Sequence, residues 1–278
     1  MGDDAETEAT SEADRTPGEQ PVAGATAVAV PTLAARSLNK SFGHVRALRG
    51  VAFEAYAGEV TALIGDNGAG KSTLIKCLAG VIQPDGGAIE VDGRPVAMAD
   101  PQHATQLGIE TVYQDLALAP DLDAAANVFL GRELRRRINV LHNQPEMRRR
   151  TAESFRELGV GTVQDMRVPV ASFSGGQRQS VAIARAAMWA QRAIIMDEPT
   201  AALGVIQTAK VLELVKRIRE RGLAVVFISH NLPQVMEIAD RIEVMRLGAR
   251  VARFRRGETS VEQLIGAISG AYSNEVPA

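Results

Sequence analysis

The segment from Gly65 to Ser72 has the glycine spacing of a phosphate-binding loop. It lies between an apolar run expected to form a strand, Glu59–Ile64, and a stretch expected to form a helix, Lys71–Leu78. Glycines let the backbone curl so that several N–H groups point at phosphate oxygens, and the helix N-terminus adds unpaired donors. Lys71 can then reach the β- and γ-phosphates, and the Ser72 hydroxyl can bind Mg²⁺. The pattern predicts a nucleotide-binding site.

Two carboxylates follow another apolar run, where Ile194–Met196 leads directly into Asp197 and Glu198. At the end of a buried parallel strand, Asp197 can hold Mg²⁺ or its water shell beside the phosphate loop. Glu198 can accept a proton from an attacking water or orient that water. The alternative interpretation is a pair of helix-capping carboxylates before Pro199. The phosphate loop in the same chain favours the catalytic interpretation.

A second anion site is predicted at Ser174–Gln177, a Ser-Gly-Gly-Gln sequence before the helical run Gln179–Met188. Free backbone N–H groups at a helix N-terminus bind anions. One chain seldom needs two triphosphate sites for one nucleotide, whereas a dimer in which each subunit covers the other's nucleotide does. The motif therefore predicts a dimer with composite sites.

The elements that must position these residues follow a strand–helix–strand order. Ala193–Met196 is expected to be a strand, Val211–Ile218 one face of a helix, and Leu223–Ile228 the next strand. Strands joined by a helix through short connections form a right-handed βαβ unit, which predicts an α/β fold with a parallel sheet. His230 follows the last of these strands, so we expect it at the carboxyl edge of the sheet, near the phosphates. The more polar, arginine-rich segment at about 116–176 is expected to form an inserted helical subdomain.

Length and composition exclude several classes of protein. The chain has 278 residues, of which 46% are apolar and 23% charged, values typical of a globular protein. Its single cysteine excludes a disulfide scaffold and a cysteine zinc cluster, and its four histidines show no ligand spacing. No run approaches the roughly 18 apolar residues that a membrane helix needs. We therefore expect a soluble, cytoplasmic protein.

The net charge of −2 conceals two different parts of the chain. Residues 1–21 carry seven acidic residues and one arginine, a balance of −6, whereas the rest carries 30 basic and 26 acidic residues, a balance of +4. Such an acidic, apolar-poor segment cannot bury enough surface to offset the entropy of ordering, so residues 1–30 are expected to be a disordered tail. The folded domain is expected over 31–278.

From Leu33 to Ala271, these motifs in this order resemble the ATP-binding cassette (ABC) ATPases. The resemblance implies a P-loop, RecA-like parallel core with an antiparallel β subdomain and an inserted helical subdomain. Gly65–Ser72 resembles the Walker A loop, Ile194–Asp197 resembles Walker B with Glu198 as catalytic base, and Ser174–Gln177 resembles the signature motif that binds ATP held by the opposite subunit. The residues implied to bind ATP are Phe42, Gly65, Asn67, Gly68, Gly70, Lys71, Ser72, Thr73, Ser174, Gly175, Gly176 and Gln177.

Three further positions take their roles from the resemblance alone. Gln114 is similar to the Q-loop glutamine that touches Mg²⁺ and senses the membrane partner, which makes the implied metal ligands Ser72, Gln114 and Asp197. His230 is similar to the switch histidine that contacts the γ-phosphate. Phe42 fits the aromatic residue that stacks on adenine. The implied catalytic residues are Lys71, Gln114, Glu198 and His230.

The chain departs from the family pattern at three positions. Phe42 replaces the commoner tyrosine, which keeps the stacking face and loses the hydroxyl. Phe173 replaces the usual leucine before the signature serine. Gly204 stands where the D-loop often has aspartate, which puts communication across the dimer through this loop in question.

Three segments, Asn127–Glu133, Gln177–Arg185 and Thr200–Val205, are most similar to the importers of simple sugars of the ribose and fructose type. This similarity implies an ATPase that energises monosaccharide uptake through separate permease subunits at the cytoplasmic face of the membrane. The implied partners are a second copy of the chain, the permeases and, indirectly, a solute-binding protein. The alternatives are an importer of another small polar solute, a non-transport ABC ATPase acting on ribosomes or DNA, and a regulatory P-loop protein with little turnover.

Two arginine clusters, 135–137 and 148–150, fall in the expected helical insertion. They can contact anionic lipid or a permease, although a solvated helix face is the more frequent structure for such a run. Nucleic-acid binding is not expected, because no aromatic residues alternate with the arginines.

Overall fold

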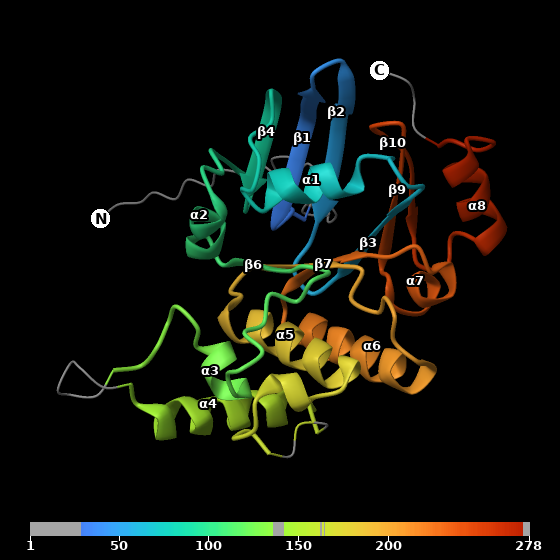
Figure 1. Ribbon diagram of the computed structural model, residues 1–278. Helices are drawn as coiled ribbons and strands as arrows, with labels where there is room; N and C mark the ends of the chain where they lie inside the picture. Colours follow the sequence, from blue (N-terminus) through green and yellow to red (C-terminus); the bar gives the residue numbers. More distant parts are fainter. Residues whose placement is uncertain (1–28, 136–141, 162, 164, 275–278) are drawn as a thin grey trace, which may run out of the picture.

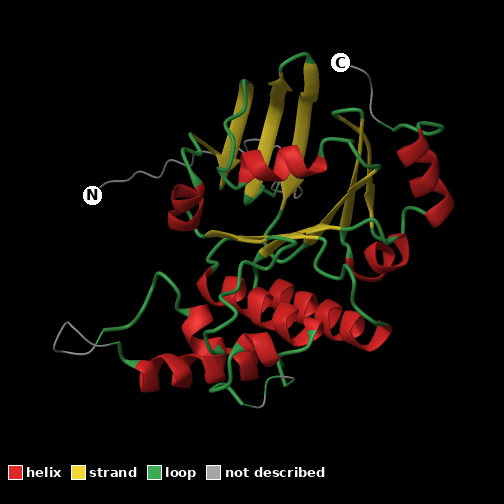
Figure 2. Cartoon of the chain, in the orientation of Figure 1, coloured by secondary structure: helices red, strands yellow, loops and turns green. Residues whose placement is uncertain are grey.

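The computed structural model describes residues 29–135, 142–161, 163 and 165–274. These residues form two β-sheets and several helices, with a group of helices gathered below the larger sheet (Figures 1 and 2). The acidic tail expected over 1–30 lies outside the described residues except for positions 29 and 30. Arg136 and Arg137 of the first arginine cluster also lie outside them.

The larger sheet has six strands in the order β10-β9-β3-β8-β7-β6. All neighbours from β9 to β6 pair in parallel, and β10 joins one edge antiparallel to β9. The strands are β3 (Val60–Gly65), β6 (Ile109–Val112), β7 (Ala193–Asp197), β8 (Ala224–Ile228), β9 (Arg241–Arg246) and β10 (Ala249–Arg255). The predicted β7–helix–β8 unit is confirmed, because β7 and β8 are parallel neighbours.

The smaller sheet is antiparallel and has the order β2-β1-β4-β5. Its strands are β1 (Leu33–Phe42), β2 (Val45–Ala55), β4 (Gly86–Val91) and β5 (Arg94–Val96). Together the two sheets and the helices confirm the predicted α/β class, with a mainly parallel core and an antiparallel β subdomain.

The helices connect and cover these sheets. They are α1 (Lys71–Leu78), α2 (Pro101–Gln106), α3 (Ala124–Val128), α4 (Gln144–Glu157), the 3₁₀ turn Val170–Ser172, α5 (Gly175–Trp189), α6 (Val205–Glu220), α7 (Leu232–Ile238) and α8 (Val261–Ser269). Within the described ranges, no helix is long and apolar enough to cross a bilayer.

Successive residues of the central strands point into two different cores, because side chains of a strand alternate between its faces. Leu63, Ile195 and Val226 pack with α1 and the antiparallel sheet, so α1 lies between the two sheets (Figure 1). Ile194 and Phe227 pack on the opposite face, in the core that includes α5 and α6. Burial on both faces explains why β3, β7 and β8 are almost wholly apolar.

Helices α3 and α4 lie within the segment expected to form the helical insertion, whose limits at about 116 and 176 stay a prediction. Asp123 caps α3 by accepting a hydrogen bond from the Ala126 N–H, and its carboxylate also pairs with Arg148 of α4 at 2.9 Å. Arg149 and Arg150 both pair with Glu146 one turn earlier on α4. The described part of the second arginine cluster is therefore paired with carboxylates of the same subdomain.

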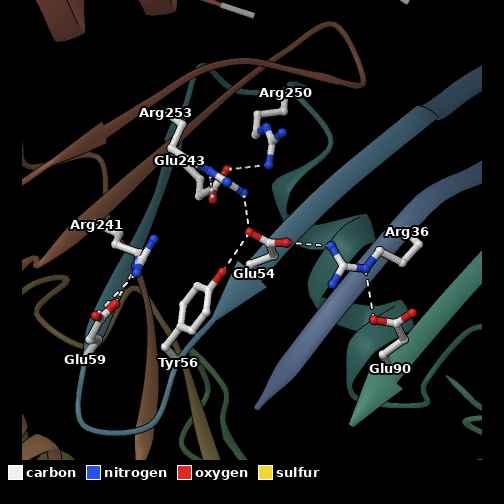
Figure 3. A network of polar contacts seen from close by, with 9 residues as sticks. All are labelled: Arg36, Glu54, Tyr56, Glu59, Glu90, Arg241, Glu243, Arg250 and Arg253. Carbon is white, nitrogen blue, oxygen red and sulfur yellow. Dashed lines mark hydrogen bonds and ion pairs between the residues drawn. The ribbon is translucent and has the colours of Figure 1, made fainter. Parts of the chain in front are cut away.

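A chain of ion pairs joins the two sheets (Figure 3). On the antiparallel sheet, Arg36 of β1 pairs with Glu54 of β2 at 2.5 Å. Glu54 also pairs with Arg253 of β10 at 2.9 Å, and Arg253 pairs with Glu243 of β9 at 2.8 Å. Glu243 is 1% exposed and accepts a further ion pair from Arg250 at 3.2 Å. Burial raises the pKa of Glu243, while the two arginines favour its ionised form.

Removing the charge of Glu243 tests how much this network stabilises the edge of the main sheet. We expect Glu243→Gln to lower the free energy of unfolding by about 2–3 kcal/mol, because two partly buried guanidinium groups lose the buried carboxylate that they share. Glu213→Gln is the control, since Glu213 forms an exposed pair with Arg217 at 3.5 Å and should change stability by less than about 0.5 kcal/mol. Denaturant unfolding measures both. Equal effects would contradict a special role for the buried carboxylate.

Candidate functional site

The loop between β3 and α1 forms the floor of a cavity of about 420 Å³. Its lining includes every residue from Asn67 to Thr73, which covers most of the predicted Walker A positions. The Lys71 ammonium folds over the loop and donates to the Gly65 and Asp66 carbonyls at 2.7 and 3.0 Å. Burial lowers the pKa of Lys71, and the nearby Glu198, Asp66 and Asp197 oppose that shift. The Lys71 ammonium group therefore lies at the cavity formed by the phosphate loop.

Tertiary contacts bring further residues to this cavity that the motifs did not indicate. Val45, Arg46 and Arg49 reach it from β2, and Leu247 and Gly248 reach it from the turn between β9 and β10. That turn is held against the site by two backbone hydrogen bonds, from the Arg49 N–H to the Gly248 carbonyl and from the Gly248 N–H to the Ala69 carbonyl. No sequence signal links these distant segments to the phosphate loop.

Phe42, implied to stack on adenine, ends β1 and is 50% exposed. The residues that line the phosphate-loop cavity, in the described part of the chain, do not include it. Its ring lies 5.7 Å from the Lys40 ammonium. Contact between Phe42 and an adenine ring stays a prediction.

The strand register brings the predicted catalytic residues to one edge of the main sheet. Ile228 of β8 is the register partner of both Asp197 in β7 and Leu63 in β3. Glu198 directly follows Asp197, His230 lies two residues beyond Ile228, and Gly65 ends β3. Parallel strands that end in register therefore place the phosphate loop, both carboxylates and the histidine side by side.

The two carboxylates have different surroundings. Burial and then the neighbouring Glu198 raise the pKa of Asp197, and Lys71 opposes this shift. Glu198 has a left-handed backbone (φ 51°) and donates its N–H to the Ile228 carbonyl at 3.1 Å. Its side chain, 18% exposed, lies 2.9 Å from Nδ1 of His230, whose side chain is 76% exposed. The structure thus pairs the expected switch histidine directly with the expected base.

Gln114 lies in an exposed turn two residues after β6. The turn is closed by a hydrogen bond from the Leu116 N–H to the Tyr113 carbonyl at 3.0 Å. Arg185 of α5 donates to the carbonyls of Leu116 and Ala117 at 3.0 and 2.7 Å. No local sequence pattern indicates this contact, because 68 and 69 residues separate Arg185 from its partners.

Ser174 caps α5 and forms a capping box with Gln177: Ser174 Oγ accepts from the Gln177 N–H at 3.3 Å, and Gln177 Oε1 accepts from the Ser174 N–H at 2.8 Å. Gly175 and Gly176 form the first turn of the helix. These residues do not share the phosphate-loop cavity. Ser174, Gly176 and Gln177 line a different cavity, of about 1050 Å³, together with residues of α6. One chain thus keeps the two predicted anion sites apart.

The loop before α6 carries the departure at Gly204. Gly204 is the N-cap of α6 and supplies no side-chain cap. A Cβ at this position would lie 2.8 Å from Oε1 of Gln207, the mobile end of a long side chain. The next two residues, Val205 and Ile206, are 88% and 70% exposed, an uncommon state for large apolar side chains at a helix start.

Residues 48–201 match the family model described as ABC transporter. The chain is 45% identical over 247 residues to the fructose import ATP-binding protein FrcA of Rhizobium meliloti, covering 87% of this chain and 95% of that protein. It is 46% identical over 229 residues to the xylose/arabinose import ATP-binding protein XylG of Sulfolobus acidocaldarius, covering 82% of this chain and 90% of that protein.

A longer relative matches only in part. The ribose import ATP-binding protein RbsA 2 of Streptomyces avermitilis is 45% identical over 222 residues, which cover 80% of this chain and 43% of that protein.

Solved structures have the same fold. An ATP-binding cassette of an ABC transporter in its ADP conformation superposes with a TM-score of 0.71 at 25% identity, covering 86% of this chain and 95% of that one. A dimeric cassette in a post-hydrolysis state bound to ADP and Pi superposes with a TM-score of 0.67 at 25% identity, covering 82% and 100%. This chain has the expected order of motifs: the phosphate loop after β3, the capped signature helix α5, and the carboxylates at the end of β7. The chain therefore belongs to the ABC transporter family, as one of its ATP-binding subunits.

Proposed function

We propose that this chain hydrolyses ATP to drive the import of a monosaccharide through separate permease subunits. The observation that carries the proposal is the 45–46% identity to two sugar import ATP-binding proteins along at least 90% of their own lengths. The geometry supports the hydrolytic part, because the phosphate loop and the Glu198–His230 pair lie at one edge of the sheet. Fructose, xylose, arabinose and ribose appear in the names of relatives, and they mark the class of solute.

ATP phosphates would fit the loop because its glycines have no side chains to cover the backbone N–H groups. A Cβ at Gly68 would meet nothing within 4 Å, so the space above its backbone is open to a ligand. A Cβ at Gly70 would lie 2.6 Å from the Ala47 carbonyl oxygen, and the residue has φ 101°. Gly68 therefore faces the ligand, and Gly70 allows β2 to approach the loop closely.

The donor set also fits Mg²⁺, a hard cation that prefers oxygen ligands and is usually held by one or two carboxylates together with substrate phosphates. Asp197 and Ser72 would supply protein oxygens, and Gln114 a third from the turn after β6. Burial and then the neighbouring Glu198 raise the pKa of Asp197, and a bound cation would oppose that shift. Across the described ranges, no group of three or more acidic, histidine or cysteine side chains could hold a metal ion. Bound Mg²⁺ would neutralise charge on the β- and γ-phosphates.

Glu198 is placed to act on water at the end of β7. Its carboxylate would accept a proton from, or orient, the water that attacks the γ-phosphorus, while Lys71 stabilises charge on the phosphates. The 2.9 Å contact with His230 would hold the Glu198 side chain in position. The highly exposed imidazole can also rotate toward a phosphate, which agrees with the role that the family resemblance implies.

A second copy would complete each site. The signature residues at the start of α5 line a different cavity from the phosphate loop, so they need a second chain to meet ATP. The exposed Val205 and Ile206, next to this cavity, offer apolar surface for that contact. The dimer would transmit closure to the permeases through the Gln114 turn and the helical insertion, with a solute-binding protein delivering the sugar outside. Import of another small polar solute is the alternative.

The glycine argument predicts a loss of nucleotide affinity in Gly70→Ala. Its Cβ would force β2 away from the loop, and we expect the Kd for ATP to rise at least about tenfold, or 1.4 kcal/mol. Gly131→Ala is the matched control, because Gly131 also has a positive φ (78°) and a Cβ there would meet nothing within 4 Å. Titration with a fluorescent ATP analogue measures both variants. Equal losses would show that backbone strain alone, rather than the contact with Ala47, weakens binding.

The role of Glu198 predicts that Glu198→Gln binds ATP normally, turns over at least about 100-fold more slowly and accumulates as an ATP-bound dimer. The glutamine keeps the size of the side chain and loses its basicity. ATPase assays and light scattering with ATP measure the two effects. Glu237→Gln, which removes a surface partner of Lys216, is the control and should keep full activity. Unchanged steady-state hydrolysis in Glu198→Gln would remove Glu198 from the base role.

The transport proposal predicts solute-dependent turnover in a reconstituted system. The chain is combined in liposomes with candidate permease and sugar-binding proteins, and ATPase activity is followed with sugars and with amino acids. We expect fructose or a pentose to stimulate hydrolysis severalfold, and Lys71→Ala to abolish the response. Stimulation by an amino acid alone would favour the alternative solute class. Association with ribosomes in place of any permease would overturn transport.

A further inference from the structure

Arg185 lies in the C-terminal third of α5 (Gly175–Trp189) and reaches across to the turn that carries Gln114. Its two terminal nitrogens donate to two consecutive carbonyls, those of Leu116 at 3.0 Å and Ala117 at 2.7 Å. A guanidinium group presents its donors in a rigid plane and can span two acceptors at once, which an ammonium group cannot do with the same precision. The contact therefore fixes both the position and the orientation of this stretch of backbone.

The backbone that Arg185 holds is strained. Leu116 and Ala117 both have left-handed backbones, with φ of 62° and 45°, a conformation that non-glycine residues adopt at a cost in free energy. Two such residues in succession persist only when surrounding contacts hold them. The two carbonyls accept from the same guanidinium group, and the turn they follow contains Gln114. Loss of these hydrogen bonds would let the turn relax.

The charge of Arg185 has no carboxylate of its own. Across the described ranges, no acidic oxygen lies within ion-pair distance of it, and the nearby Glu110 pairs with Arg132 at 2.6 Å instead. Burial lowers the pKa of Arg185. Glu110 and Asp115 are near enough to favour the charged form of Arg185, but its hydrogen bonds go to the two carbonyls. Its main effect is to hold the strained turn.

We propose that Arg185 is a positioning residue that ties the Gln114 turn to the helix whose N-terminus carries Ser174. Arg185 follows Ser174 by 11 residues, or about 16 Å along one helix. The link makes Gln114 and the signature residues move as one body when the dimer closes. This inference rests on the proposed role of Gln114 at the nucleotide-bound metal.

A double-mutant cycle between Arg185 and Gln114 tests this link. We expect Arg185→Gln to lower kcat about tenfold and to raise the Mg²⁺ concentration needed for half-maximal turnover, with KM for ATP changed by less than about twofold. Arg185→Lys should recover part of kcat, because it keeps the charge and a donor nitrogen but lacks the planar pair of nitrogens that spans both carbonyls. In the Gln114→Ala background, Arg185→Gln should cause no further loss, since Arg185 acts through Gln114.

Arg192→Gln is the matched control. Arg192 also donates to a backbone carbonyl, that of Leu107 at 2.9 Å, and pairs with Asp92 far from the turn. Its effect should be the same in both backgrounds, and it should leave the Mg²⁺ dependence unchanged. Thermal melts report whether each variant is folded, and the cycle is run with Arg185→Lys if the glutamine variant is not.

The outcomes separate the two proposals. Equal losses of kcat on mutating Arg185 in the presence and absence of Gln114 would overturn the positioning role while leaving the proposed function intact. If Gln114→Ala alone leaves turnover and Mg²⁺ dependence unchanged, this result contradicts the proposed role of Gln114 and, with it, the role of Arg185. A coupled loss, with a shifted Mg²⁺ dependence that Arg192→Gln lacks, supports the inference.

Discussion

The site depends on one constraint, the parallel register that ends β3, β7 and β8 at the same edge of the main sheet. Ile228 pairs with both Leu63 and Asp197, so a phosphate loop and two carboxylates separated by more than 120 residues emerge beside one another. A shift of one residue in a strand would turn its side chains to the opposite face. The buried apolar residues on both faces of these strands prevent such a shift, because each face belongs to a different core.

One of the two cores holds the helix that follows the phosphate loop. Helix α1 begins at Lys71 and packs between the sheets, with Leu74, Ile75 and Leu78 buried. The antiparallel sheet presses on α1 from one side, and the ion pairs from Glu54 through Arg253 to Glu243 connect this sheet to the edge of the main one. Nucleotide binding at the loop would therefore act on a fixed frame. The side chain of His230 lies at the edge of that frame and is 76% exposed.

The placement of the two predicted anion sites within one chain agrees with the proposal that a second chain completes each nucleotide site. The phosphate loop and the start of α5 line separate cavities, which is the arrangement that the proposed composite sites of a dimer require. Arg185 connects the signature helix α5 to the turn with Gln114. A movement of either segment is then transmitted to the other.

The sequence alone determined the α/β class, the phosphate loop between a strand and a helix, and the two carboxylates at the end of β7, because each depends on neighbouring residues and on periodicities of two or 3.6. It also indicated the family, since these motifs occur in a fixed order. Only the tertiary structure decided that His230 contacts Glu198, that Arg46 and Leu247 reach the phosphate-loop cavity while Phe42 does not, and that Arg185 holds the strained turn. These contacts join segments far apart in the chain, and they arise from strand order and packing, which no local pattern encodes.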